Sequence, residues 1–213
     1  LLDGHAQQLE WRFLRQDNGQ PFDCEIRISL FRWRDQDLLF GVLHDITERK
    51  RYLATQEFLA NHDSLTRLPN RYWLNHHLEQ RLAQADAPPF AVLLLDMNRF
   101  KEVNDTLGHQ HGDQVLTELG QRLQEWLNEQ NSVIARLGGD EMAIVSDHLA
   151  DLLALNSLCS SISQVIARPL QVDGIALELS ASIGVALFPE HGQTSHDLLR
   201  CADIAMYQAK RER

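Results

Sequence analysis

The sequence predicts an α/β (α+β) protein whose main domain spans about 150 residues. Two observations predict this class. From about residue 62 to the end, helical stripes of apolar residues alternate with short apolar runs that are typical of buried strands. Before residue 47, polar and apolar residues alternate with the period of a half-buried strand. A charged segment that favours helix lies between the two parts.

Composition limits the classes of partner. The chain has 213 residues, of which 44% are hydrophobic, enough for one complete core and part of a second. The 20 Lys and Arg against 30 Asp and Glu give a net charge of −10, so the surface as a whole repels phosphate and argues against nucleic-acid binding. A phosphate ligand would need local cations or a metal. The three cysteines are widely spaced without a CxxC pair, which indicates reduced thiols.

We expect a cytoplasmic location for this chain. No apolar run approaches the ~20 residues of a membrane helix, and the N-terminus lacks the pattern of a signal peptide. The start "LLDGHAQQLEWRF" and the end "AKRER" are abrupt, as in a piece cut from a longer protein. That parent protein could still be membrane-anchored.

The N-terminal part reads as antiparallel sheet followed by a helix. Its three stretches, "LEWRFLRQ", "FDCEIRISLFRW" and "LLFGVLHDI", are separated by "DNGQ" and "RDQD", which are typical hairpin turns. This antiparallel sheet is too small to be a domain alone. From Thr47 the charged segment predicts a connecting helix. Its sparse apolar residues give only weak heptad evidence for pairing with a second copy.

The main domain begins with a turn at "HDSLTRLPNR" and a helix to about Ala85. "FAVLLLDMNRF" predicts a strand that is buried on both faces and ends at Asp96. A helix then follows Asp113, with an apolar stripe at Val115, Leu116, Leu119, Leu123, Trp126 and Leu127.

The second half continues the alternation. "SVIARL" and "MAIV" predict two strands on either side of a Gly-Gly-Asp-Glu turn. A helix over roughly 148–167, a strand at "LELSASIGVALF" and a helix at "SHDLLRCADIAMYQAKR" complete the pattern. Ser195 is a plausible N-cap of the last helix.

Three acids predict a cation site if the two strands that carry them are neighbours. Asp96 ends a buried strand, and Asp140 and Glu141 lie at the tip of the hairpin. Like charges held that close need a cation, and carboxylate oxygens suit Mg²⁺ held together with substrate phosphates. Gly138 and Gly139 leave room for a ligand to approach the backbone. The alternative, on the hairpin alone, is a turn with solvated acids.

The segment from 96 to 113 adds further polar groups. Lys101 offers a cation for phosphate oxygens, and Asn104 and Asp113 can read the amide-like edge of a purine. Taken singly, Lys101 would be a surface lysine and Asp113 a helix cap. Together they make metal, phosphate and base contacts available within 18 residues.

The motifs in this region resemble those of the GGDEF diguanylate cyclases. The resemblance covers residues 62–213 and rests on "RLGGDEM" together with "DSLTRLPNR" (63–71), "DMNRFKEVNDTLGHQHGD" (96–113), "SIG" (182–184) and "ADIAMYQAK" (202–210), all in the family's order and spacing. It implies a palm-like domain with a central, mostly antiparallel sheet flanked by helices.

The resemblance also implies a role for each matching residue. Asp96 and Asp140 would bind Mg²⁺ (or Mn²⁺), with Glu141 near the metals and the Met97 carbonyl completing the coordination. Asp140 would accept the proton of the attacking hydroxyl, and Lys101 would stabilise charge in the transition state. Asn104 and Asp113 would select guanine. The remaining members of the implied GTP-binding set are Phe100, Lys101, His109, Gly138, Gly139 and Lys210.

In this family two GTP molecules condense to cyclic di-GMP with release of two pyrophosphates. Each subunit holds one GTP, so the resemblance implies that a C2 homodimer is required for catalysis. The net charge of −10 predicts that nucleic acid is not a partner.

Four departures from the family pattern bear on activity. Met142 stands where the family has Phe, which predicts weaker support for the turn. Asn98 replaces a common second Asp and lowers the negative charge near the metal site. "EQNS" (129–132) occupies the place of the product-inhibition motif RxxD, so we expect no product-inhibition site. The chain ends at Arg213, before the Arg of the family's "xxGRN".

The N-terminal part resembles the end of a PAS sensor domain, because "DIT" at 45–47 matches the junction to a signalling helix. We therefore expect part of a PAS domain over 1–47, a linker helix over 48–61 and the GGDEF domain over 62–213. Two alternatives to an active cyclase stay open. One is a GTP-binding regulatory module preceding a C-terminal EAL phosphodiesterase domain, and the other is a structural dimerising module.

Overall fold

The computed structural model describes residues 7–34, 36–85, 87–147 and 152–212. The chain divides into two compact units, Leu1–Phe58 and Leu59–Arg213, and each is described by itself. None of the helices that the structure describes combines the length and the apolar composition that a bilayer crossing requires.

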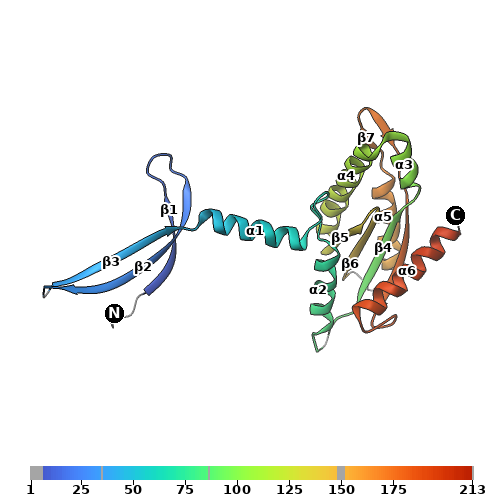
Figure 1. The fold of residues 1–213 in the computed structure, drawn as a ribbon. Coiled ribbons are helices and arrows are strands. Elements are labelled where there is room, and N and C mark those ends of the chain that lie inside the picture. Colours follow the sequence, from blue (N-terminus) through green and yellow to red (C-terminus); the bar gives the residue numbers. More distant parts are fainter. Residues whose placement is uncertain (1–6, 35, 86, 148–151, 213) are drawn as a thin grey trace. The chain divides into compact units, whose positions relative to one another are not determined.

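Unit 1 is a three-stranded antiparallel sheet in the order β1-β2-β3, as predicted (Figure 1). Its strands are β1 (Gln7–Leu14), β2 (Pro21–Trp33) and β3 (Gln36–Asp45), and α1 (Thr47–Asn61) follows directly. The strand pairing continues to Trp33 and Gln36, so the second hairpin turn is tighter than the predicted "RDQD". Thr47 begins the helix, as the sequence predicts.

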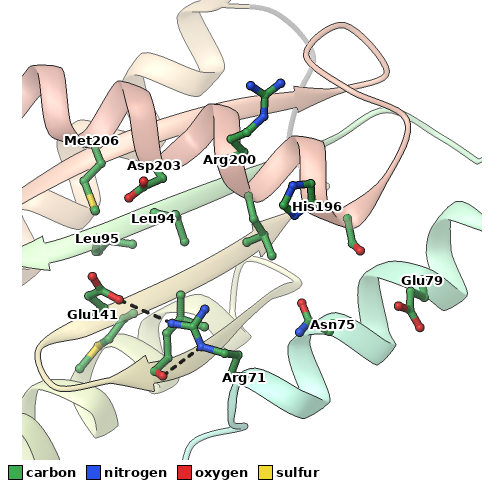
Figure 2. Close-up of a pocket in the computed structure, with 14 residues that line it drawn as sticks. Arg71, Asn75, Glu79, Leu94, Leu95, Glu141, His196, Arg200, Asp203 and Met206 are labelled. Carbon is green, nitrogen blue, oxygen red and sulfur yellow. Dashed lines mark hydrogen bonds and ion pairs between the residues drawn. The ribbon is translucent and has the colours of Figure 1, made fainter.

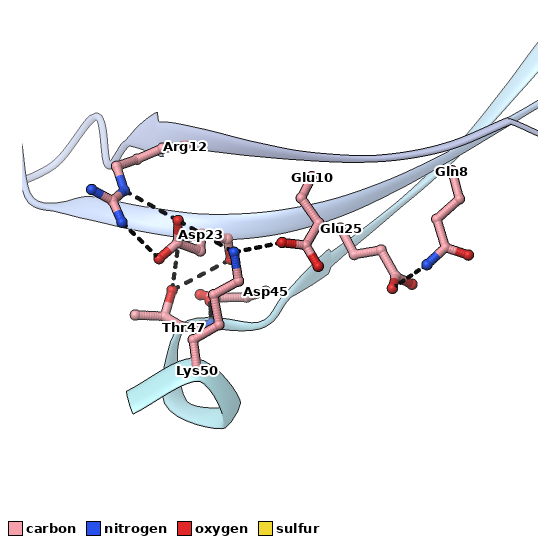
Figure 3. Close-up of polar contacts among 8 residues, drawn as sticks. All are labelled: Gln8, Glu10, Arg12, Asp23, Glu25, Asp45, Thr47 and Lys50. Carbon is pink, nitrogen blue, oxygen red and sulfur yellow. Dashed lines mark hydrogen bonds and ion pairs between the residues drawn. The ribbon is translucent and has the colours of Figure 1, made fainter. Parts of the chain in front are cut away.

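A polar cluster joins the start of α1 to this sheet (Figure 3). The Thr47 amide donates to Asp45 at 3.0 Å, and the Asp23 amide donates to the Thr47 hydroxyl at 2.9 Å. Lys50 forms an ion pair with Glu10 at 2.5 Å. These contacts fix the first turn of α1 to both outer strands of unit 1.

Unit 2 contains a four-stranded antiparallel sheet in the order β5-β6-β4-β9, which confirms the mixed fold with an antiparallel sheet. The strands and helices of this unit are α2 (Arg71–Leu82), β4 (Phe90–Met97), α3 (Phe100–Leu107), α4 (His109–Asn128), β5 (Ser132–Gly138), β6 (Glu141–Ser146), α5 (Leu152–Ala167), β7 (Leu170–Val172), β8 (Ile175–Leu177), β9 (Ala181–Phe188) and α6 (Ser195–Arg211). A separate β7-β8 hairpin lies beyond α5.

The central strand β4 is buried along its whole length, as its apolar run predicts. Alternate residues pack on opposite faces of the sheet because side chains on a strand alternate in direction. Leu93 and Leu95 belong to a cluster with α4 and α5, whereas Val92 and Leu94 belong to a cluster with α2 and α6. The end of β4, where Asp96 lies, is therefore held rigidly from both faces.

The structure corrects several element boundaries. Residues 100–107 form a separate helix, α3, and α4 already begins at His109, so Asp113 lies inside α4 and is not its cap. The cap position of α4 belongs to Gly108. In α6 the N-cap is Thr194, whose side chain accepts from the Asp197 amide, and Ser195 is the first helical residue.

Two other predicted boundaries shift by several residues. The predicted strand over 177–188 is divided, because β8 ends at Leu177 and β9 starts at Ala181. α2 ends at Leu82 and not near Ala85. The predicted helix over 148–167 corresponds to α5, and residues 148–151 lie outside the described residues.

Candidate functional site

Two of the predicted acids lie directly opposite each other. β4 and β6 are neighbours, and their register pairs Asp96 with Glu141. Asp140 precedes Glu141 in the turn, and Asp96 is 9% exposed. Within the described ranges, no three His, Cys, Asp or Glu side chains gather as a ready-made metal cage. The structure therefore brings Asp96 and Glu141 together at one end of the two inner strands, here called the carboxylate edge, with Asp140 beside them.

The turn between β5 and β6 depends on its glycines. Gly138 has φ +137° and Gly139 has φ +55°, values that residues with a Cβ rarely adopt. The β5–β6 register shifts between Arg136 and Gly138, which is a β-bulge. A Cβ at either glycine would meet nothing within 4 Å. The two glycines thus set the backbone conformation and leave the space beside it open.

Arg136 stabilises this turn through hydrogen bonds to its backbone. Its guanidinium donates to the Gly139 carbonyl from Nε at 3.0 Å and from Nη2 at 2.8 Å. Nη1 donates to Asp63 at 2.7 Å, and the Arg136 amide donates to the Pro69 carbonyl. Sequence reasoning did not assign this role, although Asp63 and Arg136 both belong to the quoted motifs. The turn is therefore tied to the segment that leads into α2.

Each acid of the opposed pair has a cation from a different helix. Lys210 on α6 lies 2.6 Å from Asp96, and this hydrogen bond raises the pKa of Lys210. Arg71 on α2 lies 3.7 Å from Glu141 and donates to the Leu137 carbonyl at 3.3 Å. Lys210 was expected near a phosphate, and Arg71 was not singled out from the sequence. Both helices therefore deliver positive charge to the carboxylate edge.

Asp140 has a different electrostatic environment from an exposed acid. Burial is the main reason that its pKa is raised, and the neighbouring charge of Asp96 acts in the same direction. Its own backbone amide, Lys210 and Arg136 oppose this shift. A further positive charge near this position would favour the ionised carboxylate.

Five of the predicted nucleotide-binding residues lie on α3 and α4. Phe100 is buried at the start of α3, Lys101 is exposed, and Asn104 is half-buried. A Cβ at Gly112 of α4 would lie 1.9 Å from the Asn104 side-chain oxygen, so only glycine permits this close approach of the two helices. His109 and Asp113 are exposed on the first turns of α4. The junction between the two helices thus places Asn104 next to the helix that carries Asp113.

Asn98 and Met142, two departures from the family pattern, both have structural partners. The Asn98 amide nitrogen donates to the Ser180 hydroxyl, and its oxygen accepts from Ser182, each at 2.9 Å. Asn98 therefore ties the end of β4 to β9. Met142 is 1% exposed and packs in the core cluster with α4 and α5, so it supports the strand behind the turn.

A cleft of about 590 Å³ borders the carboxylate edge between α2 and α6. Its floor is apolar and includes Leu94 and Leu137. Figure 2 shows Arg71 extending from α2 toward Glu141 at one end of the cleft, with His196 and Arg200 on α6. The Arg71 side chain therefore lines the cleft and also contacts Glu141 and the Leu137 carbonyl beside the β5–β6 turn.

The site is thus that of an α/β domain whose antiparallel sheet presents opposed carboxylates beside a glycine turn, with cations from two flanking helices. Within this class, the chain belongs to the GGDEF family. The family described as "Diguanylate cyclase, GGDEF domain" matches residues 60–213.

Relatives and solved structures agree with this assignment. The chain is similar to the bifunctional diguanylate cyclase/cyclic di-GMP phosphodiesterase MucR of Pseudomonas aeruginosa, with 44% identity over 71% of this chain and 22% of that protein. It is 42% identical to the diguanylate cyclase TpbB of the same organism, over 72% of this chain and 36% of that protein. The chain thus spans only between about a fifth and two fifths of these relatives' length.

Among solved structures, a sensory box/GGDEF family protein from Caulobacter crescentus is similar in fold as well as sequence. The TM-score is 0.67 at 38% identity, covering 72% of this chain and all of that one.

Proposed function

We propose that this chain is a diguanylate cyclase that condenses two GTP molecules into cyclic di-GMP and two pyrophosphates. The observation that carries the proposal is the pairing of Asp96 with Glu141 beside the Gly138–Gly139 turn. This arrangement puts acidic oxygens next to a backbone that a triphosphate can approach closely. Membership of the GGDEF family supports the same reaction.

The donor set fits a divalent cation. Asp96, Asp140 and the Met97 carbonyl would hold Mg²⁺ or Mn²⁺, with Glu141 beside them. Mg²⁺ commonly binds one or two carboxylates together with substrate phosphates, so a complete protein cage is not needed. When bound, the ion polarises the attacking 3′-hydroxyl and neutralises phosphate charge. Asp140 would accept the hydroxyl proton, and Lys101 and Lys210 would balance the charge of the transferring phosphate.

The guanine base would bind at the α3–α4 junction. The Asn104 amide can donate and accept at the edge of a purine, and the Asp113 carboxylate can accept there. A carboxylate at this position favours guanine because adenine lacks the N1–H and N2–H donors. Phe100 and His109 would border the nucleotide, and Gly138 and Gly139 would admit its phosphates. This assignment explains why the close contact at Gly112 matters: it fixes Asn104 beside α4.

Catalysis also requires a second subunit. Each site holds one GTP, so the attacking hydroxyl comes from the nucleotide of a partner in a face-to-face C2 homodimer. The N-terminal sheet and α1 would act as the end of a PAS sensor domain and its signalling helix. A reaction on GTP agrees with the cytoplasmic location expected from the sequence.

A second function has specific support. The chain could be a GTP-binding regulatory GGDEF module, with its output in a C-terminal EAL phosphodiesterase domain of the parent protein. The relative named as a bifunctional cyclase and phosphodiesterase favours this alternative, as does Met142 in the signature. The two functions share the GTP site and differ in whether cyclic di-GMP is formed.

One experiment separates the two. The purified chain is incubated with GTP and Mg²⁺, and cyclic di-GMP and pyrophosphate are followed by chromatography. The cyclase predicts both products in a 1:2 ratio, whereas GTP binding by a dimeric chain without product would leave the regulatory module.

Two variants test the assigned residues. Asp140→Ala should abolish synthesis, whereas Asp113→Ala should mainly weaken GTP binding. Glu125→Ala, an exposed acid later on α4, is the matched control and should behave as wild type. Wild-type turnover in both site variants would show that the residues are assigned wrongly.

A further inference from the structure

His111 makes two hydrogen-bond contacts that join three segments of unit 2. Its Nδ1 lies 2.6 Å from the Leu107 carbonyl oxygen, at the end of α3. Its Nε2 lies 2.9 Å from an Asp173 carboxylate oxygen, in the turn between β7 and β8. The imidazole itself is on the first turn of α4. One side chain therefore spans α3, α4 and the β7–β8 hairpin.

The chemistry of these partners defines the protonation state. A carbonyl oxygen and a carboxylate can only accept, so both ring nitrogens must donate for both hydrogen bonds to exist. Only the imidazolium carries two N–H groups. The other charged or titratable groups on the elements that His111 joins are Lys101, Glu102 and Asp105 on α3, His109, Asp113, Glu118, Arg122 and Glu125 on α4, and Asp173 in the β7–β8 turn. Of these, Asp173 forms an ion pair with His111.

The position of this contact relates it to nucleotide binding. Leu107 and Gly108 form the connection between α3 and α4, so the His111 contact fixes the angle between the helix of Asn104 and the helix of Asp113. The adjacent Gly112 leaves no free space beside Asn104, so a small change in that angle moves one guanine-reading group relative to the other. Loss of one proton from His111 removes one of the two tethers.

We propose that His111 is a positioning residue for guanine-nucleotide binding, and that its charged form holds the α3–α4 junction in the binding geometry. This inference rests on the proposed GTP site. The consequence is a GTP affinity that is higher when the imidazole carries both N–H groups than when it carries one, so the affinity falls as the pH rises. His109, two residues earlier, has no such pair of acceptors among the contacts described and is not needed for this effect.

The test compares binding across pH. Dissociation constants for a GTP analogue with a methylene group between the α- and β-phosphates, which cannot react, are measured by calorimetry from about pH 5.5 to pH 8.5. His111→Gln is compared with wild type at each pH, so that ionisation of the nucleotide cancels in the ratio. Because the pair is partly exposed, we expect the variant to bind about three- to five-fold more weakly at the acidic end and equally at the basic end.

Controls separate this role from a purely structural one. His76 is an exposed histidine on α2, so the ratio of the His76→Gln and wild-type dissociation constants should stay at one over the whole pH range. Asp173→Asn removes the charged acceptor and should flatten the pH dependence as His111→Gln does. ¹⁵N NMR of the wild-type ring should show two protonated nitrogens at acidic pH.

Two outcomes have different consequences. A ratio that stays constant with pH, or a lower stability of His111→Gln with unchanged affinity, would overturn the role of His111 while the GTP site stands. Wild-type protein that binds no nucleotide at any pH would overturn the proposed function itself, and the inference with it.

Discussion

Strands β3 and β4 have similar apolar runs and opposite environments. β4 reads "FAVLLLDM" and is buried at every position. β3 reads "QDLLFGVLHD" and is exposed at every position, with Leu39 at 63% and Phe40 at 61%. The difference is that helices cover both faces of the unit 2 sheet, whereas the apolar residues that are buried in the described part of unit 1 are Cys24 and Ile46. An apolar run thus indicates a strand, but the elements that pack against the strand decide whether its side chains are buried.

The comparison extends to what stabilises each unit. Unit 2 is held by two continuous apolar clusters on either side of its sheet. Unit 1 is held by strand pairing and by polar contacts such as those among Asp23, Asp45 and Thr47. We therefore expect changes in apolar residues to affect unit 2 strongly and changes in polar residues to affect unit 1 more selectively.

The largest difference is expected for matched leucines. Leu93→Ala in β4 removes a side chain that is 0% exposed and leaves a cavity in the core, which should cost about 3 to 5 kcal/mol. Leu39→Ala in β3 removes a side chain that already contacts water and should change stability by less than about 0.5 kcal/mol. Chemical denaturation of the full chain measures both. A large cost at Leu39 would mean that another surface covers β3.

Matched glycines give the next largest difference. A Cβ at Gly184 in β9 would lie 2.1 Å from the Ala202 carbonyl oxygen and 2.1 Å from the Met206 amide of α6. Gly184→Ala should therefore push α6 off the sheet and cost about 3 kcal/mol. Gly41 in β3 has nothing within 4 Å, so Gly41→Ala should be neutral or stabilise by about 0.5 kcal/mol.

Calorimetry of the two glycine variants follows the melting transition of each unit. Equal changes in the two melting temperatures would contradict the conclusion that α6 packs closely on β9 while nothing lies within 4 Å of a Cβ at Gly41. Because α6 carries Lys210, Gly184→Ala should also weaken the Lys210–Asp96 contact.

The sequence predicts much of this fold because local patterns specify it. The apolar run that ends at Asp96 and the glycines of the β5–β6 turn place each acid at the end of a strand, and the pairing of β4 with β6 in the structure brings them together. Contacts between elements that are far apart in the sequence cannot be predicted from the local pattern of residues. Helix α3 and the early start of α4 were not predicted because Asn104, Asp105, Thr106, Gly108 and Gly112 are weak helix formers. Likewise, the approach of Arg71 to Glu141 depends on how α2 lies over β5.

The same reasoning separates the two kinds of candidate residue. Residues within one motif, such as Asp140 and Glu141, were found because their chemistry is concentrated in sequence. Residues that act across the fold, such as Asp63 with Arg136, are 73 positions apart and carry no local signal of their partnership.

Breaking an ion pair should also cost more stability in unit 2 than in unit 1, with a smaller difference than for the leucines and glycines. The Arg136 and Asp63 side chains are 10% and 22% exposed, so Arg136→Met should leave a poorly solvated carboxylate and cost about 2 kcal/mol. Arg32 and Asp37, on β2 and β3, are 73% and 50% exposed, so Arg32→Met should cost less than about 0.5 kcal/mol. Urea denaturation of both variants at neutral pH makes the comparison.

The Asp63 pair also has a pH signature. Although burial favours its neutral form, hydrogen bonds from Thr66 and Arg136 lower the pKa of Asp63. A lowered pKa stabilises the fold above the ordinary carboxyl pKa, and this contribution is lost as the pH falls below about 4. Arg136→Met should flatten that acid loss in unit 2. An unchanged acid profile would show that the pair does not supply the stabilisation.

The smallest effect is expected at Asp45, where the polar basis of unit 1 can be tested directly. Hydrogen bonds from the Thr47 side chain and backbone, with a further contribution from Arg15, lower the pKa of Asp45 to about 2. The carboxylate therefore stabilises the junction of β3 and α1 above the ordinary pKa, near pH 4, and loses this effect as the pH falls toward about 2. Asp45→Asn should lower the melting temperature of unit 1 slightly at neutral pH and make its acid dependence shallower between those values. Asp37→Asn, on the same strand and in an ion pair with exposed Arg32, is the control and should leave the profile unchanged. If the two variants gave the same profile, the start of α1 would not be fastened through Asp45, and the contrast between a polar unit 1 and an apolar unit 2 would lose its clearest local example.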